Sequence, residues 1–105
     1  MHREAMMIVR ADLCQRLTAL ERQAERGERV AFAATLRSMR DIGHAYGCAP
    51  VVSIVDAIGR LPMGAGHHRS AALYLDRLHD AIACDRLDER ASEALLASVS
   101  VHLRP

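Results

Sequence analysis

Apolar residues recur at steps of three and four along most of the chain, and this spacing constrains the fold more than any other feature. Side chains three or four positions apart share one face of an α-helix, so each such run predicts an amphipathic helix. The first run spans about residues 3–26 and the second about residues 28–46. The predicted inner faces are Met6, Val9, Leu13, Leu17, Leu20 and Ala24 in the first helix, and Phe32, Leu36, Met39, Ile42, Gly43 and Tyr46 in the second.

Two glycines are placed to end these helices. Gly27 follows the first run and Gly47 follows the second. Glycine readily adopts the left-handed conformation that commonly ends a helix. Because the reversal at Gly27 is tight, we expect the first two helices to be antiparallel neighbours.

The segment of residues 50–61 has features of both a strand and a helix. Its VVSIV stretch is rich in the β-branched residues typical of a buried strand. The helical spacing of its apolar residues, and the place of Pro50 at a first helical position, favour a helix. The predicted inner face is Val51, Ile54, Val55, Ile58 and Leu61, with Ser53, Asp56, Ala57 and Arg60 on the other side.

The remainder of the chain predicts a connection and two more helices. Residues 62–68 hold a proline and two glycines and are expected to form a mobile loop. A helix over about 69–84 would turn Leu75, Leu78 and Ile82 inward and Asp76, Arg77 and Asp80 outward. Asp88 is suited to cap a last helix over about 89–103. Its predicted inner face is Ala91, Leu95, Val99 and Leu103.

Length and composition support a single helical domain. The chain of 105 residues is long enough to bury one core. Half of the residues are hydrophobic but only three are aromatic, so Leu, Ile, Val, Met and Ala must fill that core. Leu and Ala are strong helix formers. We therefore expect residues 1–105 to form one all-α domain, an antiparallel up-and-down four-helix bundle with room for a fifth helix.

The charge balance argues against two classes of partner. Fourteen arginines, with no lysine, oppose thirteen acidic residues, which gives a net charge of +1. A nucleic-acid binder or a basic membrane arm usually carries a much larger positive excess. We expect neither nucleic acid nor a membrane as a partner.

Cysteine usage and the N-terminal residues favour a reducing compartment. The three cysteines, at positions 14, 48 and 84, include no close pair that would indicate a disulfide or a zinc site. Cys14 and Cys48 lie beside apolar residues and are expected to be small buried side chains rather than nucleophiles. The apolar run near the N-terminus is too short for a signal peptide. These features predict a cytoplasmic protein.

Three polar motifs suggest a metal or anion site, but each lacks the partners that such a site needs. His67 and His68 are adjacent, and no carboxylate or thiolate accompanies them at a useful spacing. Asp76, His79 and Asp80 form half of a bundle-type carboxylate metal site, without the second half. The Gly-x-Gly motif before His67 lacks the preceding strand of a dinucleotide site. We expect no metal and no cofactor.

The second predicted helix and its exit carry one resemblance to a known family. The chain has Arg37-x-Met39-Arg40-Asp41, then Gly47-Cys48, then a further amphipathic helix. This order resembles that of histidine phosphotransfer domains, four-helix bundles that relay phosphoryl groups between response-regulator receivers in bacterial signalling. In that family the helix carries His-x-Leu-Lys-Gly and ends at a Gly followed by a small residue. The resemblance covers about 25 residues closely.

The departures from the family decide the function that the resemblance implies. Arg37 stands at the phosphoacceptor position, and its guanidinium stays protonated and cannot act as the nucleophile. Arg40 keeps the positive charge of the family's lysine, whereas Asp41 replaces its glycine. The expected function is that of a non-enzymatic interaction module. Its partner, a receiver in the signalling interpretation, would bind to Arg37, Arg40, Asp41 and His44.

Two alternatives remain open at this point. His44 lies two helical turns beyond Arg37, shares its face and would be a displaced phosphoacceptor in an active phosphotransferase. The other alternative is a structural or oligomerising protein with no role in signalling.

Self-association is expected through the first helix. Met7, Ala11 and Cys14 form a second apolar stripe beside the inner face, and two stripes need two partners. A twofold homodimer would cover the second stripe. In the alternative, the last helix covers it and the chain is a monomer.

Overall fold

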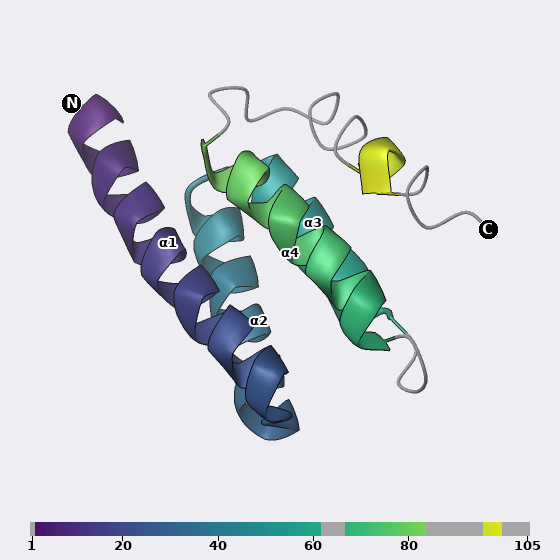
Figure 1. The fold of residues 1–105 in the computed structure, drawn as a ribbon. Coiled ribbons are helices and arrows are strands. Elements are labelled where there is room, and N and C mark those ends of the chain that lie inside the picture. Colours follow the sequence, from purple (N-terminus) through teal and green to yellow (C-terminus); the bar gives the residue numbers. More distant parts are fainter. Residues whose placement is uncertain (1, 62–66, 84–95, 100–105) are drawn as a thin grey trace.

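The chain folds into a four-helix bundle of the expected kind (Figure 1). The computed structural model describes residues 2–61, 67–83 and 96–99. Its helices are α1 (His2–Arg26), α2 (Arg29–Ala45), α3 (Ala49–Gly59) and α4 (His67–Ala83). Each helix packs against the next along the chain, and α1 also packs against α4, which closes the bundle. The all-α prediction is confirmed, and the described ranges contain no strand.

Both predicted glycine stops form as expected. Gly27 has φ +68° and Gly47 has φ +69°. At each stop, the residue after the glycine donates its N–H to a carbonyl five positions back, from Glu28 to Gln23 at 3.0 Å and from Cys48 to Gly43 at 2.7 Å. This is the Schellman arrangement, which satisfies carbonyl groups left over at a helix end. The chain therefore reverses within a few residues at both places.

The ambiguous segment is helical. Pro50 lies in the first turn of α3, as predicted, where its missing N–H costs no helical hydrogen bond. One expectation for this helix is wrong. Ala57 was predicted to face outward, but it is only 8% exposed. Because α3 packs between α2 and α4, its buried surface is wider than one stripe.

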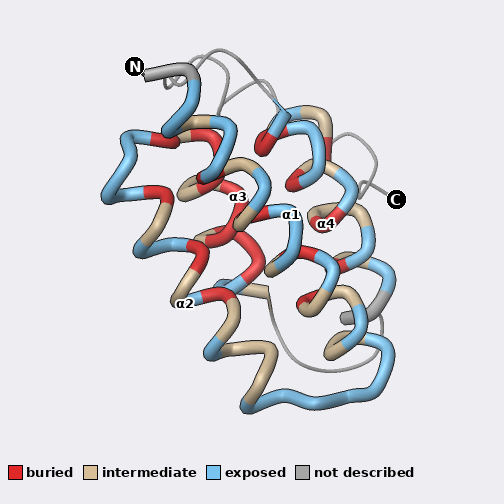
Figure 2. The backbone as a smooth tube through the Cα atoms, turned by 90° about the vertical axis from the view of Figure 1, so that its left-hand side faces the viewer, coloured by how far each residue is buried: buried red, intermediate tan, exposed pale blue. Residues whose placement is uncertain are grey.

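The core lies where the four helices meet, and buried residues line the inner side of each helix in Figure 2. The inner stripe of α1 is confirmed, since Val9, Leu13, Leu17 and Leu20 are buried and Met6 and Ala24 pack against them. The core also includes Leu36, Met39, Cys48, Val51, Ile54, Val55, Ile58, Leu75, Leu78, Ala81 and Ile82.

Three predicted core residues lie outside the core. Leu61 is only partly buried, because α3 ends at Gly59 and the helical spacing does not extend to it. Tyr46 is 52% exposed, because it follows the last residue of α2 and the helical spacing no longer fixes its direction. Cys14 is exposed, because it lies one position beyond the buried Leu13 and so points away from the core. Cys48, by contrast, is buried as predicted.

The structure describes only part of the segments predicted after α3, which are a loop and two helices. The backbone of His67 and His68 belongs to α4, so the helix begins two residues earlier than expected and these histidines are not in a loop. Residues 62–66 and the proposed cap at Asp88 lie outside the described residues. Of the predicted last helix, residues 96–99 are described, and they are helical, with Val99 buried. Within the described part, no helix is long and apolar enough to cross a membrane.

Candidate functional site

The four residues singled out on the second helix lie together on the outer side of α2. Arg37, Arg40, Asp41 and His44 are all exposed. Their spacing of three and four positions places them along one side of α2. Within the described ranges, no hydrogen bond or ion pair involves the side chains of Arg37, Asp41 or His44. These three side chains are therefore available to a partner.

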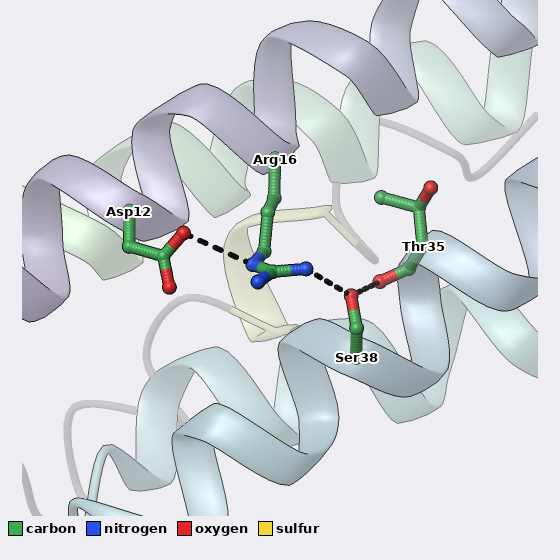
Figure 3. A network of polar contacts seen from close by, with 4 residues as sticks. All are labelled: Asp12, Arg16, Thr35 and Ser38. Carbon is green, nitrogen blue, oxygen red and sulfur yellow. Dashed lines mark hydrogen bonds and ion pairs between the residues drawn. The ribbon is translucent and has the colours of Figure 1, made fainter.

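The opposite edge of α2 is held against α1 by a polar chain (Figure 3). Asp12 accepts a hydrogen bond from Arg16 Nε at 3.1 Å, and Arg16 Nη1 donates to Ser38 Oγ at 3.0 Å. Ser38 in turn donates to the backbone carbonyl of Thr35 at 2.8 Å. The pair of Asp12 and Arg16 confirms the predicted i,i+4 contact. Because these contacts occupy the α1 edge, they fix α2 with its arginine side turned away from α1.

Arg40 also belongs to the contact between α2 and α3. Its Nε lies 2.7 Å from Asp56 Oδ1. The prediction placed Asp56 on the outer face of its helix and gave it no role. The ion pair neutralises part of the predicted docking face, and it orients the Arg40 guanidinium toward α3.

A groove runs between α2 and α3 beyond this ion pair. Its volume is about 470 Å³, in the lower range of ligand pockets. The groove is lined by Ala33, Leu36, Arg37 and Arg40 from α2, and by Val55, Asp56, Gly59 and Arg60 from α3 and its end. Leu36 and Val55 are buried and form its apolar floor, whereas Arg37, Gly59 and Arg60 are exposed at its rim. The groove is thus open to solvent.

The groove carries excess positive charge. Three guanidinium groups and one carboxylate line it, and that carboxylate already pairs with Arg40. Arg37 and Arg60 have no acidic partner among the residues that the structure describes. Guanidinium groups suit bidentate contact with carboxylates. The arrangement can bind an acidic group, and it holds no nucleophile and base in contact.

The sequence prediction missed Asp56, Gly59 and Arg60. The sequence does contain a signal for the pairing of Arg40 with Asp56, because α2 and α3 run antiparallel on either side of the Gly47 turn. Arg40 lies seven residues before that turn and Asp56 nine residues after it, so the two are brought to nearly the same level. Counting outward from the turn would have paired them.

The other predicted motifs do not form sites in the described structure. His79 Nε2 lies 3.2 Å from Glu21 Oε1, which joins α4 to α1, and Asp80 pairs with Arg77 at 2.8 Å. Asp76 is exposed. No group of three or more potential metal ligands occurs among the described residues. The side chains of His67 and His68 and the Gly-x-Gly motif lie outside what is described.

The buried cysteine is unsuited to nucleophilic chemistry. Burial raises the pKa of the Cys48 thiol, and the guanidinium of Arg10 opposes this effect only in part. A raised pKa keeps the group in its thiol form, whereas the thiolate is the reactive species. Cys48 therefore serves as a small core residue at the start of α3.

Comparison of the chain with protein-family models, with characterised proteins and with solved structures finds no match. The assignment of a function therefore depends on the geometry of the site.

Proposed function

We propose that this chain is a non-enzymatic interaction module of cytoplasmic bacterial signalling, and that it docks an acidic partner protein through the outer side of α2. The observation that carries the proposal is the exposed row of Arg37, Arg40 and His44 beside a groove with excess positive charge. The acidic active site of a response-regulator receiver has the complementary charge. Electrostatic complementarity of this kind raises association rates and suppresses wrong partners.

The resemblance to histidine phosphotransfer domains supports a receiver as the partner. The fold is an antiparallel four-helix bundle, and its second helix exposes the positions that align with the family's phosphoacceptor region. Arg37 occupies the acceptor position and cannot carry a phosphoryl group as histidine does. In this proposal the module binds a receiver without accepting phosphate from it.

The test measures binding of purified receivers from the native host to the full chain. Arg37→Glu should weaken binding about tenfold or more, because it replaces an attraction to acidic groups with a repulsion. Arg22→Glu is the matched control, since Arg22 is equally an exposed arginine but lies on α1. Receivers that bind both variants equally, or that bind neither the variants nor the unmodified chain, would contradict the proposal.

The exposure of His44 favours a second candidate, an active phosphotransferase. A phosphoacceptor imidazole must stand clear of the helix, and the His44 side chain is exposed and without a hydrogen-bond partner among the described residues. Incubation with a phosphorylated receiver separates the two candidates. Acid-labile phosphate that appears on the chain and is lost in His44→Gln would establish phosphotransfer and overturn the non-enzymatic proposal.

We also propose that the chain forms a twofold homodimer through α1. Met7 is 68% exposed, and Ala11 and Cys14 beside it on the outer side of α1 are exposed as well. In a twofold contact around Ala11, Met7 of one copy would pack near Cys14 of the other. The described residues of the last helix, 96–99, leave this stripe uncovered.

Sedimentation of the full chain tests the dimer. Met7→Glu should raise the dimer dissociation constant about tenfold or more, because a carboxylate would be desolvated in the interface. Ile8→Glu is the control, since Ile8 is 71% exposed but lies about 100° around the helix from Met7. A monomer at micromolar concentration for the unmodified chain would end this proposal.

A further inference from the structure

The contact between α2 and α3 is tight at one end and open at the other. Near the Gly47 turn, a Cβ atom on Gly43 would lie 2.7 Å from Val52 Cγ2, so the helices approach as closely as a glycine permits. At the other end, nothing lies within 4 Å of a Cβ atom built on Gly59. Gly59 and Ala33 both line the groove, and their small size leaves space between the two helices.

This open end offers two kinds of contact to a ligand. Its floor is apolar, since Leu36 and Val55 are buried beneath it. Its rim carries Arg37 on α2 and Arg60 at the end of α3, neither of which pairs with an acid in the described part of the chain. The ion pair between Arg40 and Asp56 lies between this region and the tight end. A fitting ligand therefore has an apolar group with acidic groups beside it.

We propose that this groove binds an acidic segment of a partner protein, in which one apolar side chain enters between Ala33 and Gly59 and flanking carboxylates pair with Arg37 and Arg60. The inference rests on the proposed docking function and extends the docking surface from α2 to α3. Buried apolar anchors and arginine contacts commonly dominate the energetics of protein interfaces. Nucleic acid fits less well, because Asp56 adds a carboxylate to the groove and the floor side chains, Leu36 and Val55, are apolar.

The first experiment selects ligands for the full chain from random twelve-residue peptides displayed on phage. Enriched peptides should carry Asp or Glu on both sides of an aliphatic residue. The double variant Arg37→Glu/Arg60→Glu should reverse this preference and enrich Lys or Arg. An absence of enriched acidic peptides, or an unchanged preference in the double variant, would overturn the inference. Binding of a fluorescein-labelled dT20 strand as tight as that of the selected peptide would overturn it too.

The second experiment fills the groove without altering charge. Gly59→Leu should weaken binding of the selected peptide about tenfold, because its side chain would occupy the space intended for the ligand. Gly59→Ala is the matched control and should change the affinity less than about threefold, since a single methyl group leaves most of that space free. Circular dichroism of both variants verifies that the bundle is intact. Equal affinity of the Gly59→Leu variant and the unmodified chain would overturn the proposal.

The same variants distinguish this inference from the proposed function. If receiver binding is lost with Arg37→Glu but is unchanged by Gly59→Leu and Arg60→Glu, docking on α2 stands and the groove proposal fails. If Arg37→Glu leaves receiver binding unchanged, the proposed function fails, and peptide selection alone decides on the groove. Loss of binding in all three variants supports both.

Discussion

Gly43 and Gly59 lie at the two ends of the contact between α2 and α3, and the same residue type has opposite surroundings there. Gly43 is buried, and its missing side chain lets Val52 pack directly onto the backbone of α2. Gly59 is exposed, and its missing side chain leaves open space beside Ala33. One glycine allows the helices to touch and the other keeps a groove open between them.

The side chains at the two ends also differ, since those at the tight end are buried and those at the rim of the open end are charged and exposed. At the tight end, the start of α3 buries Cys48, Pro50 and Val51. At the open end, Arg37 and Arg60 stand at the rim over a small apolar floor. In our proposal, the tight end stabilises the helix pair and the open end binds the partner. Variants at each end should separate these two properties.

The largest effect is expected at the tight end. An exposed helical Gly→Ala change usually stabilises a protein by about 0.5–1 kcal/mol. Gly43→Ala should instead lower the free energy of unfolding by about 1–3 kcal/mol, because overpacking forces Val52 or the helices to move. Urea denaturation measures the change. Val52→Ala should recover most of the loss in the double variant, and a neutral or stabilising Gly43→Ala would show that the two helices can part freely.

A smaller effect on stability at the tight end comes from the titration of Cys48 and depends on pH. The pKa of Cys48 is raised by burial above its ordinary value of 9.0, so the unfolded chain loses this proton at a lower pH than the folded chain. The contribution of Cys48 to the free energy of unfolding is therefore fully present below pH 9.0. It is lost as the pH rises from there through the folded-state pKa. Urea midpoints for the unmodified chain should fall more steeply above pH 9 than those of Cys48→Ala. The exposed Cys14→Ala is the control and should keep the steep fall; equal slopes for all three proteins would contradict this cause.

At the open end, a Gly→Ala substitution should stabilise the protein, whereas the same change at Gly43 should destabilise it. Gly59→Ala should raise the free energy of unfolding by about 0.5–1 kcal/mol, since nothing lies near the added methyl group and alanine favours the helix. The same urea assay that is used for Gly43→Ala provides the measurement. A loss of stability would contradict the open surroundings of Gly59 in the structure.

These contrasts mark the limit of what could be predicted from the sequence. The inner stripe of α1, the glycine stops and the helical nature of the segment predicted over 50–61 all follow from local spacing and turn chemistry, and each is confirmed, although that helix ends at Gly59. The outer row of Arg37, Arg40, Asp41 and His44 also follows from spacing, because one helix fixes which residues share a side.

The spacing within one helix does not predict the groove, because the groove depends on how two helices align; only counting outward from the Gly47 turn brings Arg40 and Asp56 to nearly the same level. The register of α2 against α3 sets the pairing of Arg40 with Asp56 and places both Ala33 and Gly59 along the groove, and no single helical pattern contains this register. Tyr46 illustrates a related limit, since helical periodicity stops at Ala45 and says nothing of the next side chain.

The smallest effect is expected between the two ends, at the ion pair of Arg40 and Asp56. Both side chains are partly exposed, at 48% and 32%, so solvent screens their attraction. A double-mutant cycle with Arg40→Ala and Asp56→Ala should give a coupling of about 0.2–1 kcal/mol, reduced in 1 M salt. The pair of Asp12 and Arg16 is a useful reference, because it is similarly exposed but lies within one helix. A coupling well above 1 kcal/mol would mean that the ion pair itself holds the helices together, and that the tight packing at Gly43 is not the main determinant of their register.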